Sequence, residues 1–138
     1  MTVTVDDVRA FLRSHHHAVL ATLRRDGRPQ MSPILVGIDD DGSMIVSTSE
    51  ATVKTLNIRR IGWASVCAFE DRFIGRWVQA EGRASVESMP DALDGLVRYY
   101  RLLAGEHPDW DDYRAAMARD RRVLLRIQLD RVVLRDSG

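Results

Sequence analysis

The chain has 138 residues, of which 45% are hydrophobic, and its 20 basic and 20 acidic residues leave it without net charge. That length and apolar content are typical of a single globular domain, which we expect to span residues 1–138. The charge balance argues against a nucleic-acid-binding protein, because such proteins generally carry a basic surface. The apolar stretch AVLATL near the start is far shorter than the ~20 residues of a transmembrane helix, so we expect no membrane association and a cytoplasmic location.

The first 50 residues predict one helix followed by three strands. Residues 5–14, VDDVRAFLRS, have apolar side chains at helical spacing and two aspartates in the first turn, where the helix dipole favours anions. The pattern then becomes β-rich and is interrupted by RDGRP and DDDGS, whose Asp-Gly pairs are typical of hairpin turns. These features predict a three-stranded meander.

The middle of the chain predicts a short helix followed by two further strands. Residues 51–61, ATVKTLNIRRI, can place Val53, Leu56, Asn57 and Arg60 on one helix face. WASVCAFED and GRWVQAEGRASVES then predict two strands, the second long enough to bend at Gly82, where a missing side chain permits a corner.

The last 50 residues predict two helices and a closing β segment. MPDALDGLVRYYRLLAGE predicts the longest helix, which starts near its proline and ends at Gly105, and HPDWDDYRAAMARDR predicts a shorter one. RVLLRIQLDRVVLRDS predicts one long strand or two. Antiparallel strands with a few short helices between them indicate an α+β protein built on a β-barrel, because closing a sheet removes its exposed edges.

The chain contains none of the familiar catalytic motifs: a Walker loop, GxGxxG, GxSxG and HExxH are all missing. The single cysteine, Cys67, excludes a disulfide within the chain, and we expect it to be a buried structural thiol. The HHH run at 15–17 fits the cation-favouring end of a helix better than a metal site, because adjacent helical residues point in different directions. His107 and the aspartates that follow it fit a helix cap better than a hydrolase site. We therefore predict no metal site and name no catalytic residue.

The only lysine, Lys54, stands out against nineteen arginines. A genome biased toward arginine codons could leave one lysine by chance. The alternative is a phosphate site at the start of a helix, because hydroxyl groups, one ammonium and free backbone N–H groups suit that anion. The residues that would supply these groups are Ser47, Thr48, Ser49, Thr52, Thr55 and Lys54, with Arg59 and Arg60 a turn later.

Three stretches carry a family resemblance: VLATLRRDGRPQMSPI, IVSTSEATVKTLNIRR and AGEHPDWDDYRAAMARDRRVLLRI. They resemble the flavin and deazaflavin oxidoreductases of the pyridoxamine 5'-phosphate oxidase-like split-barrel superfamily. Within them, GRPQxS, AxxKTxNxRR and GEHxDWDDYR are similar to actinobacterial members that use coenzyme F420 rather than FMN. The resemblance implies a split β-barrel of the FMN-binding type, with six to seven mostly antiparallel Greek-key strands and a few short helices.

The same resemblance implies a homodimer whose two cofactor clefts are lined by both chains. Lys54, Ser47 and Thr48 would hold the cofactor phosphate, and Asn57 would brace that loop. Other expected contacts lie along the deazaflavin ring and around the cleft: Gln30, Ser32, Pro33, Arg59, Arg60 and Trp77. The implied activity is hydride transfer from reduced F420 to a small conjugated organic molecule.

Two other functions remain open from the sequence. One is an FMN-dependent oxidase of the pyridoxamine 5'-phosphate type. The other is a non-catalytic protein that binds a cofactor or haem, with a histidine ligand from among His15, His16, His17 and His107. Trp110, Tyr113 and Trp77 could stack on a flat ligand in any of these functions, although such residues usually fill cores and interfaces.

Overall fold

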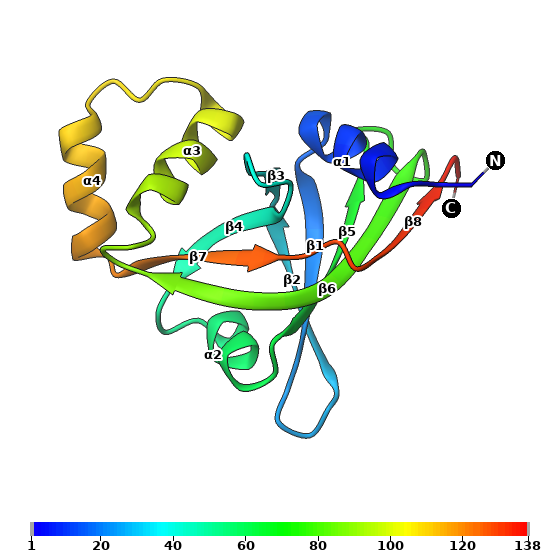
Figure 1. Cartoon of the computed structure of the whole chain (residues 1–138), viewed down its shortest axis with the longest axis horizontal. Coiled ribbons are helices and arrows are strands. Elements are labelled where there is room, and N and C mark those ends of the chain that lie inside the picture. The colour runs from blue at the N-terminus through cyan, green and yellow to red at the C-terminus, as the bar shows by residue number, and fades with distance from the viewer. Residues whose placement is uncertain (1, 138) are drawn as a thin grey trace.

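The computed structural model describes residues 2–137, which form four helices and eight strands (Figure 1). The helices are α1 (Val5–Ser14), α2 (Val53–Arg60), α3 (Leu93–Ala104) and α4 (Trp110–Arg119). The strands are β1 (His17–Leu23), β2 (Pro29–Leu35), β3 (Gly37–Ile38), β4 (Met44–Ser49), β5 (Trp63–Phe69), β6 (Trp77–Ser88), β7 (Arg122–Ile127) and β8 (Arg131–Arg135). The predicted α+β class and the predicted helices are confirmed, and the closing segment is two strands.

The strands form one curled antiparallel sheet with the order β2-β1-β5-β6-β7-β4-β3, and β8 pairs with β6. The long strand β6 joins the two halves, because residues 77–83 pair with β5 while residues 84–88 pair with β7. The predicted bend at Gly82 lies at this crossover. A Cβ atom at Gly82 would lie 2.3 Å from the carbonyl oxygen of Gln128, so the close approach of the two backbones requires glycine.

The predicted three-stranded meander is wrong in its third strand. β1 and β2 do form a hairpin, with Gly27 at φ 86° in the turn. However, β4 pairs with β7 along its whole length and with the two-residue β3, not with β2. Alternation along a strand predicts that the strand exists, but its partner is decided by distant segments, here by β7. The sheet therefore remains open between β2 and β4.

Most of the apolar residues pack in one core inside the curled sheet. It includes Leu20 of β1, Val66 of β5 and Leu125 of β7, and α1 covers one end with Val8 and Leu12. A smaller cluster lies on the other face of β4 and β7, where α3 packs on Ile45 and Leu124 through Leu96. β4 and β7 therefore carry apolar side chains on both faces.

The caps of α1 and α4 and the end of α3 lie where the sequence signals indicated, but α3 begins at Leu93, three residues after the predicted start at Pro90, and the predicted face of α2 is wrong. Thr4 and Asp7 form a capping box at the start of α1, and Asp109 caps α4 through the N–H of Asp112. Gly105 ends α3 at φ 78°. In α2, however, Val53 and Leu56 are exposed, and the buried side chains are Thr55, Asn57 and Ile58.

The remaining sequence expectations concern the histidines, the cysteine and the membrane. His15 and His16 each place Nδ1 within hydrogen-bond distance of a backbone carbonyl oxygen, that of Phe11 and that of Val36. Cys67 is half-buried, and burial raises the pKa of its thiol. Among residues 2–137, no helix combines the length and the apolar character that crossing a bilayer requires.

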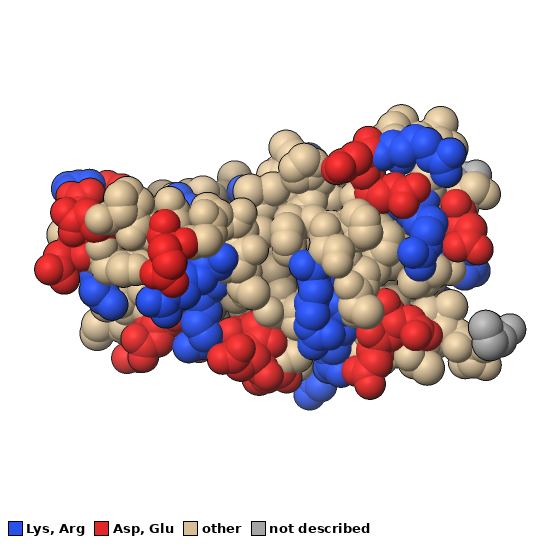
Figure 2. All heavy atoms as spheres, turned by 90° about the horizontal axis from the view of Figure 1, so that it is seen from above, with Lys and Arg blue, Asp and Glu red and all other residues tan. Residues whose placement is uncertain are grey.

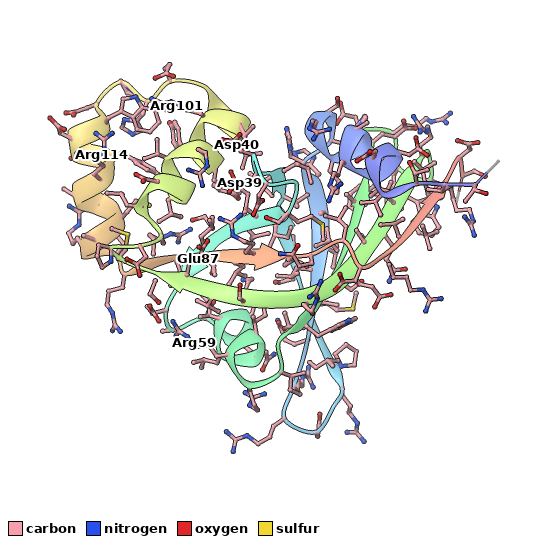
Figure 3. All side chains as sticks on the ribbon, in the orientation of Figure 1. Asp39, Asp40, Arg59, Glu87, Arg101 and Arg114 are labelled. Carbon is pink, nitrogen blue, oxygen red and sulfur yellow. The ribbon has the colours of Figure 1, made fainter. Side chains whose placement is uncertain are left out.

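A buried ionic cluster connects β7, α3 and the turn between β3 and β4. The side chain of Asp39 is 3% exposed, and it accepts hydrogen bonds from Arg98 (2.7 Å) and Arg126 (2.8 Å). Arg126 also contacts Asp41 and Glu87. Figure 3 shows Asp39 near α3 and Glu87 beside β7. Burial works to raise the pKa of Asp39, but the hydrogen bonds from both arginines outweigh it and lower the pKa well below its usual range.

Replacing Asp39 with asparagine should lower the free energy of unfolding by about 3 kcal/mol, because breaking a buried ion pair leaves charges uncompensated. Urea denaturation at pH 7 measures this change. The matched control is Asp40→Asn, because Asp40 is an exposed neighbour in the same turn, and it should stay within about 0.5 kcal/mol of the parent.

The same carboxylate predicts a pH dependence. A carboxyl group whose pKa is lowered by folding stabilises the protein above its unfolded pKa of about 4, and this contribution is lost as the pH falls further. The unfolding free energy of the parent should therefore fall below pH ~4 more steeply than that of Asp39→Asn. Equal slopes for the two proteins would contradict the role assigned to this cluster.

Candidate cofactor site

The opening of the barrel brings two unpaired strand edges close together. β2 pairs only with β1, and β4 pairs with β3 only at Met44 and Ile45, so residues 46–49 of β4 have one free edge. The two strands contact each other across the opening without forming a ladder. Unpaired edges present rows of free backbone N–H and C=O groups, which can bind a ligand or another chain.

Two buried side-chain atoms beside this opening have no hydrogen-bond partner in the described chain. They are Oε1 of Gln30 and Oγ of Ser32, which lie on the same face of β2. The amide nitrogen of Gln30 donates to the carbonyl oxygen of Met31. A buried polar atom without a partner costs about 1–3 kcal/mol, so both atoms fit a ligand that supplies hydrogen-bonding groups of its own.

The turn between β4 and α2 is held by a network of hydroxyl groups. Thr48 Oγ1 donates to Thr52 Oγ1, which lies 2.8 Å from Thr55 Oγ1, and both Thr52 and Thr55 donate to the carbonyl oxygen of Ser49. Thr52 occupies the N-cap of α2 without capping it through its side chain. The first backbone hydrogen bond of α2 runs from Leu56 N–H to the Thr52 carbonyl oxygen. The N–H groups of residues 53–55 lie before this bond and have no acceptor within the helix. The turn therefore presents donors to an anion.

The cations on α2 differ in how they are neutralised. Arg59 donates to Glu50 at 2.5 Å and to Ser88. Hydrogen bonds from Arg59 and then Ser88 lower the pKa of Glu50 to about 2, so this pair is fully charged at neutral pH. In the described part of the chain, Lys54 is half-buried and has no acidic partner, and Arg60 donates only to Asn57. Lys54 and Arg60 are therefore available for an external anion.

Asn57 connects α2 to the barrel. Its side chain is buried, receives the bond from Arg60 and donates to Thr22 Oγ1 at 3.1 Å. Thr22 stands opposite Gln30 in the β1–β2 ladder. These contacts connect the arginine on α2 to the strand that pairs with β2 opposite Gln30.

A surface groove of about 640 Å³ continues from α2 toward the β1–β2 turn. Arg25, Leu56, Arg59 and Arg60 line it. Figure 3 labels Arg59 on α2, on the side of the molecule from which the β1–β2 hairpin projects. Figure 2 views the molecule from above, away from this groove, and that face shows basic and acidic side chains intermixed.

The structure does not bring every predicted residue to this place. Ser47 lies on the face of β4 opposite to Thr48 and accepts a hydrogen bond from Arg122 under α3 and α4. Pro33 lies on the exposed face of β2, opposite to Gln30 and Ser32. Trp77 begins β6, whereas the residue of β6 that donates to and accepts from the α2 region, Ser88, ends this long strand, so Trp77 lies away from α2 within one chain.

Sequence reasoning missed two residues of the site, Thr22 and Arg25. Thr22 is fully buried and continues the inward phase of Ala18 and Leu20, so the alternation of β1 could have placed it beside the opening. Arg25 gave no local signal, because a turn arginine is usually solvated. The described residues contain no cluster of three metal-ligating side chains.

Comparisons with known proteins agree with this geometry. The profile of the pyridoxamine 5'-phosphate oxidase family matches residues 4–136. The F420H(2)-dependent biliverdin reductase of Mycobacterium tuberculosis (strain CDC 1551 / Oshkosh) is 33% identical over 132 residues, which cover 93% of this chain and 85% of that protein.

Solved structures share the fold. A conserved hypothetical protein from Mycobacterium tuberculosis aligns with a TM-score of 0.80 at 24% identity, over 99% of this chain and 86% of that chain. A pyridoxamine 5'-phosphate oxidase-related, FMN binding protein from Nostoc punctiforme aligns with a TM-score of 0.69 at 16% identity, over 98% and 85% of the two chains. These alignments confirm the split-barrel fold. The chain belongs to the pyridoxamine 5'-phosphate oxidase family.

Proposed function

We propose that this protein is an F420-dependent oxidoreductase that binds the cofactor at a homodimer interface and reduces a small conjugated organic substrate. The observation that carries the proposal is the combination of unpartnered buried atoms on β2 with the unneutralised Lys54 at the start of α2. One end of the site suits a polar planar ring and the other suits a phosphate. The 33% identical relative is named as an F420H(2)-dependent biliverdin reductase, which supports the choice of cofactor.

In this proposal the residues of the site divide into two groups. Lys54, the first N–H groups of α2 and Thr48 hold the phosphate, and Arg59 and Arg60 extend the positive charge along the helix. Gln30 and Ser32 bind the polar edge of the deazaflavin ring, whereas Pro33 lies on the outer face of β2, where it would contact the second subunit.

The bound deazaflavin supplies the hydride, so the protein needs no nucleophile of its own. What the chain supplies is orientation, because the braced α2 and the edge strand β2 fix the two ends of the cofactor relative to each other. Exclusion of water requires a cover over the opening, and a second subunit would provide it.

Exposed apolar side chains support the second subunit. Met31 (62% exposed) and Leu35 (43%) lie with Pro33 on the outer face of β2, and Phe73 (78%) lies in the β5–β6 turn. Trp77 lies on the same outer face as Phe69, its partner in the β5–β6 ladder. A two-fold dimer that buried this face would also bring residues such as Trp77 near the partner's opening.

The first prediction for this function concerns cofactor choice. F420 should bind with a dissociation constant at least tenfold below that of FMN, a difference of ~1.4 kcal/mol. Parallel fluorescence titrations of the purified protein measure both constants. Tighter binding of FMN would favour an FMN-dependent oxidase, and a Soret band in the purified protein would favour haem binding.

The second prediction concerns Lys54. Lys54→Ala should weaken F420 binding by about 10- to 150-fold, because hydrogen bonds to charged groups contribute about 1.5–3 kcal/mol. Lys54→Arg should recover part of that loss, because a planar guanidinium does not replace a compact ammonium in a turn lined by short hydroxyl side chains. The melting temperature of the cofactor-free protein should barely change, because Lys54 has no acidic partner within the described chain.

The matched control for Lys54 is Arg13→Gln, which removes one exposed charge from α1 and should leave F420 affinity unchanged. The affinity of the parent should also decrease more steeply with salt than that of Lys54→Ala. Parallel salt dependences would place the phosphate elsewhere, against Arg59 or Arg60.

The third prediction concerns assembly. Light scattering at micromolar concentration should give twice the 15.6 kDa mass of the chain. Met31→Glu should shift the mass toward one chain and weaken F420 binding, because a charge would be buried in the interface. Leu102→Glu alters another exposed apolar residue, on α3, and should leave the dimer intact. A monomer that binds F420 fully would rule out a shared site.

A further inference from the structure

A second hollow, open to solvent, lies on the other side of β4, outside the barrel. α3 and α4 follow one another between β6 and β7 and form a hairpin beside the barrel (Figure 1). Between this hairpin and the sheet is a cavity of about 340 Å³, within the range of small-molecule sites. Its lining residues are Ser47, Tyr99, Tyr100, Tyr113, Met117, Asp120 and Arg122.

Arg122 is the cation of this cavity and is not neutralised by the protein. Its guanidinium donates from Nη2 to Ser47 Oγ at 2.8 Å, and within residues 2–137 it forms no ion pair. The nearby carboxylate of Asp120 lies 3.4 Å from Nε of Arg119 instead. A half-buried guanidinium that has only one neutral partner keeps most of its five donors available, in a fork that matches a carboxylate.

Three tyrosines, Tyr99, Tyr100 and Tyr113, line the cavity, and the hydroxyls of two of them are bound to backbone carbonyl oxygens. Tyr99 Oη donates to the Leu35 carbonyl oxygen and Tyr113 Oη donates to the Leu96 carbonyl oxygen, both at 2.8 Å. Burial raises the pKa of Tyr99, and it raises that of Tyr113 to about 12, so both phenols are neutral at pH 7. The surfaces left facing the space are aromatic rings and the Met117 side chain, which suit a flat apolar ligand.

The walls are also rigid, because the tyrosines belong to a larger aromatic group. Tyr100 and Tyr113 have ring centroids 5.1 Å apart, and both pack on Trp110 and His107. Trp110 is fixed in turn by its Nε1–H bond to Glu106 and by the guanidinium of Arg101 over its ring. A preformed aromatic wall lowers the entropic cost of binding a planar molecule.

The geometry points to this cavity as a second ligand site, which binds a planar aromatic monocarboxylate with the carboxylate on Arg122 and the rings against the tyrosines. We expect the ligand to carry a single carboxylate, because the carboxylate of Asp120, which also lines the cavity, would repel a second negative charge. The site is separate from the cofactor site, because Ser47 and Thr48 point to opposite faces of β4.

Calorimetric titration of the full chain with naphthalene-2-carboxylate and with naphthalene-2-carboxamide tests this site. The acid should bind at least tenfold more tightly than the amide. Arg122→Gln should reduce acid affinity by about 10- to 150-fold, the cost of losing a charged hydrogen bond, and leave amide affinity unchanged. Arg114→Gln, which changes an exposed arginine of α4 that pairs with Asp111 and does not line the cavity, should bind the acid like the parent.

Competition separates this site from the cofactor site. The acid should bind equally well when F420 is saturating, and Lys54→Ala should bind the acid like the parent. If Arg122→Gln does not fold, Arg122→Lys provides the same test, because it keeps the charge without the fork and should bind the acid with intermediate affinity. Equal affinities for acid and amide, no binding at millimolar concentration, or displacement of the acid by F420 would each overturn the proposal.

Discussion

The arrangement of the molecule depends on a sheet that curls without closing. Every backbone group in a sheet must be paired, covered or solvated, and a complete barrel would remove both edges. Here β4 pairs with β7 on one side and with β3 only at Met44 and Ile45 on the other. Residues 46–49 of β4 and the side of β2 that faces away from β1 therefore have no strand partner. The same geometry leaves Gln30 and Ser32 with buried polar atoms that nothing in the described chain satisfies. The open edge therefore costs stability in the isolated chain and provides the place where a ligand and a partner can recover it.

Charged side chains in this protein act mainly through ion pairs with their neighbours, as expected for a chain without net charge. Most arginines are paired: Arg98 and Arg126 bind Asp39, Arg83 binds Asp130, and Arg59 binds Glu50. Lys54 and Arg122 are exceptions, and they lie on either side of β4. A compact ammonium at a helix N-terminus suits a phosphate, whereas a planar guanidinium among aromatic rings suits a carboxylate. In the proposed function, the single lysine would hold the cofactor phosphate.

Much of this could be predicted from the sequence, because local signals are strong wherever neighbouring residues decide the structure. The capped helix α1, the Gly105 end of α3 and the Gly82 crossover follow from caps, periodicity and the absence of a side chain. The predictions are wrong where segments that are distant in the sequence determine the pairing of a strand or the buried face of a helix. The partner of β4 and the buried face of α2 depend on β7 and on Thr22, which no window around residues 44–60 contains. Arg122 was missed for the same reason, because its partner Ser47 lies 75 positions away.

The period of a strand explains why two sites can exist so close together. In a β-strand, successive side chains point to opposite faces, so Ser47 and Thr48 necessarily belong to different environments although they are adjacent in sequence. Thr48 helps to order the turn that carries Lys54, and Ser47 positions Arg122 under α3 and α4. Tyr99 connects the two environments, because its ring lines the outer cavity while its hydroxyl binds the carbonyl oxygen of Leu35 at the end of edge strand β2. Because this hydrogen bond is already formed in the chain alone, Tyr99 holds the end of β2 in place without a ligand, and the two faces of β4 can bind their ligands independently.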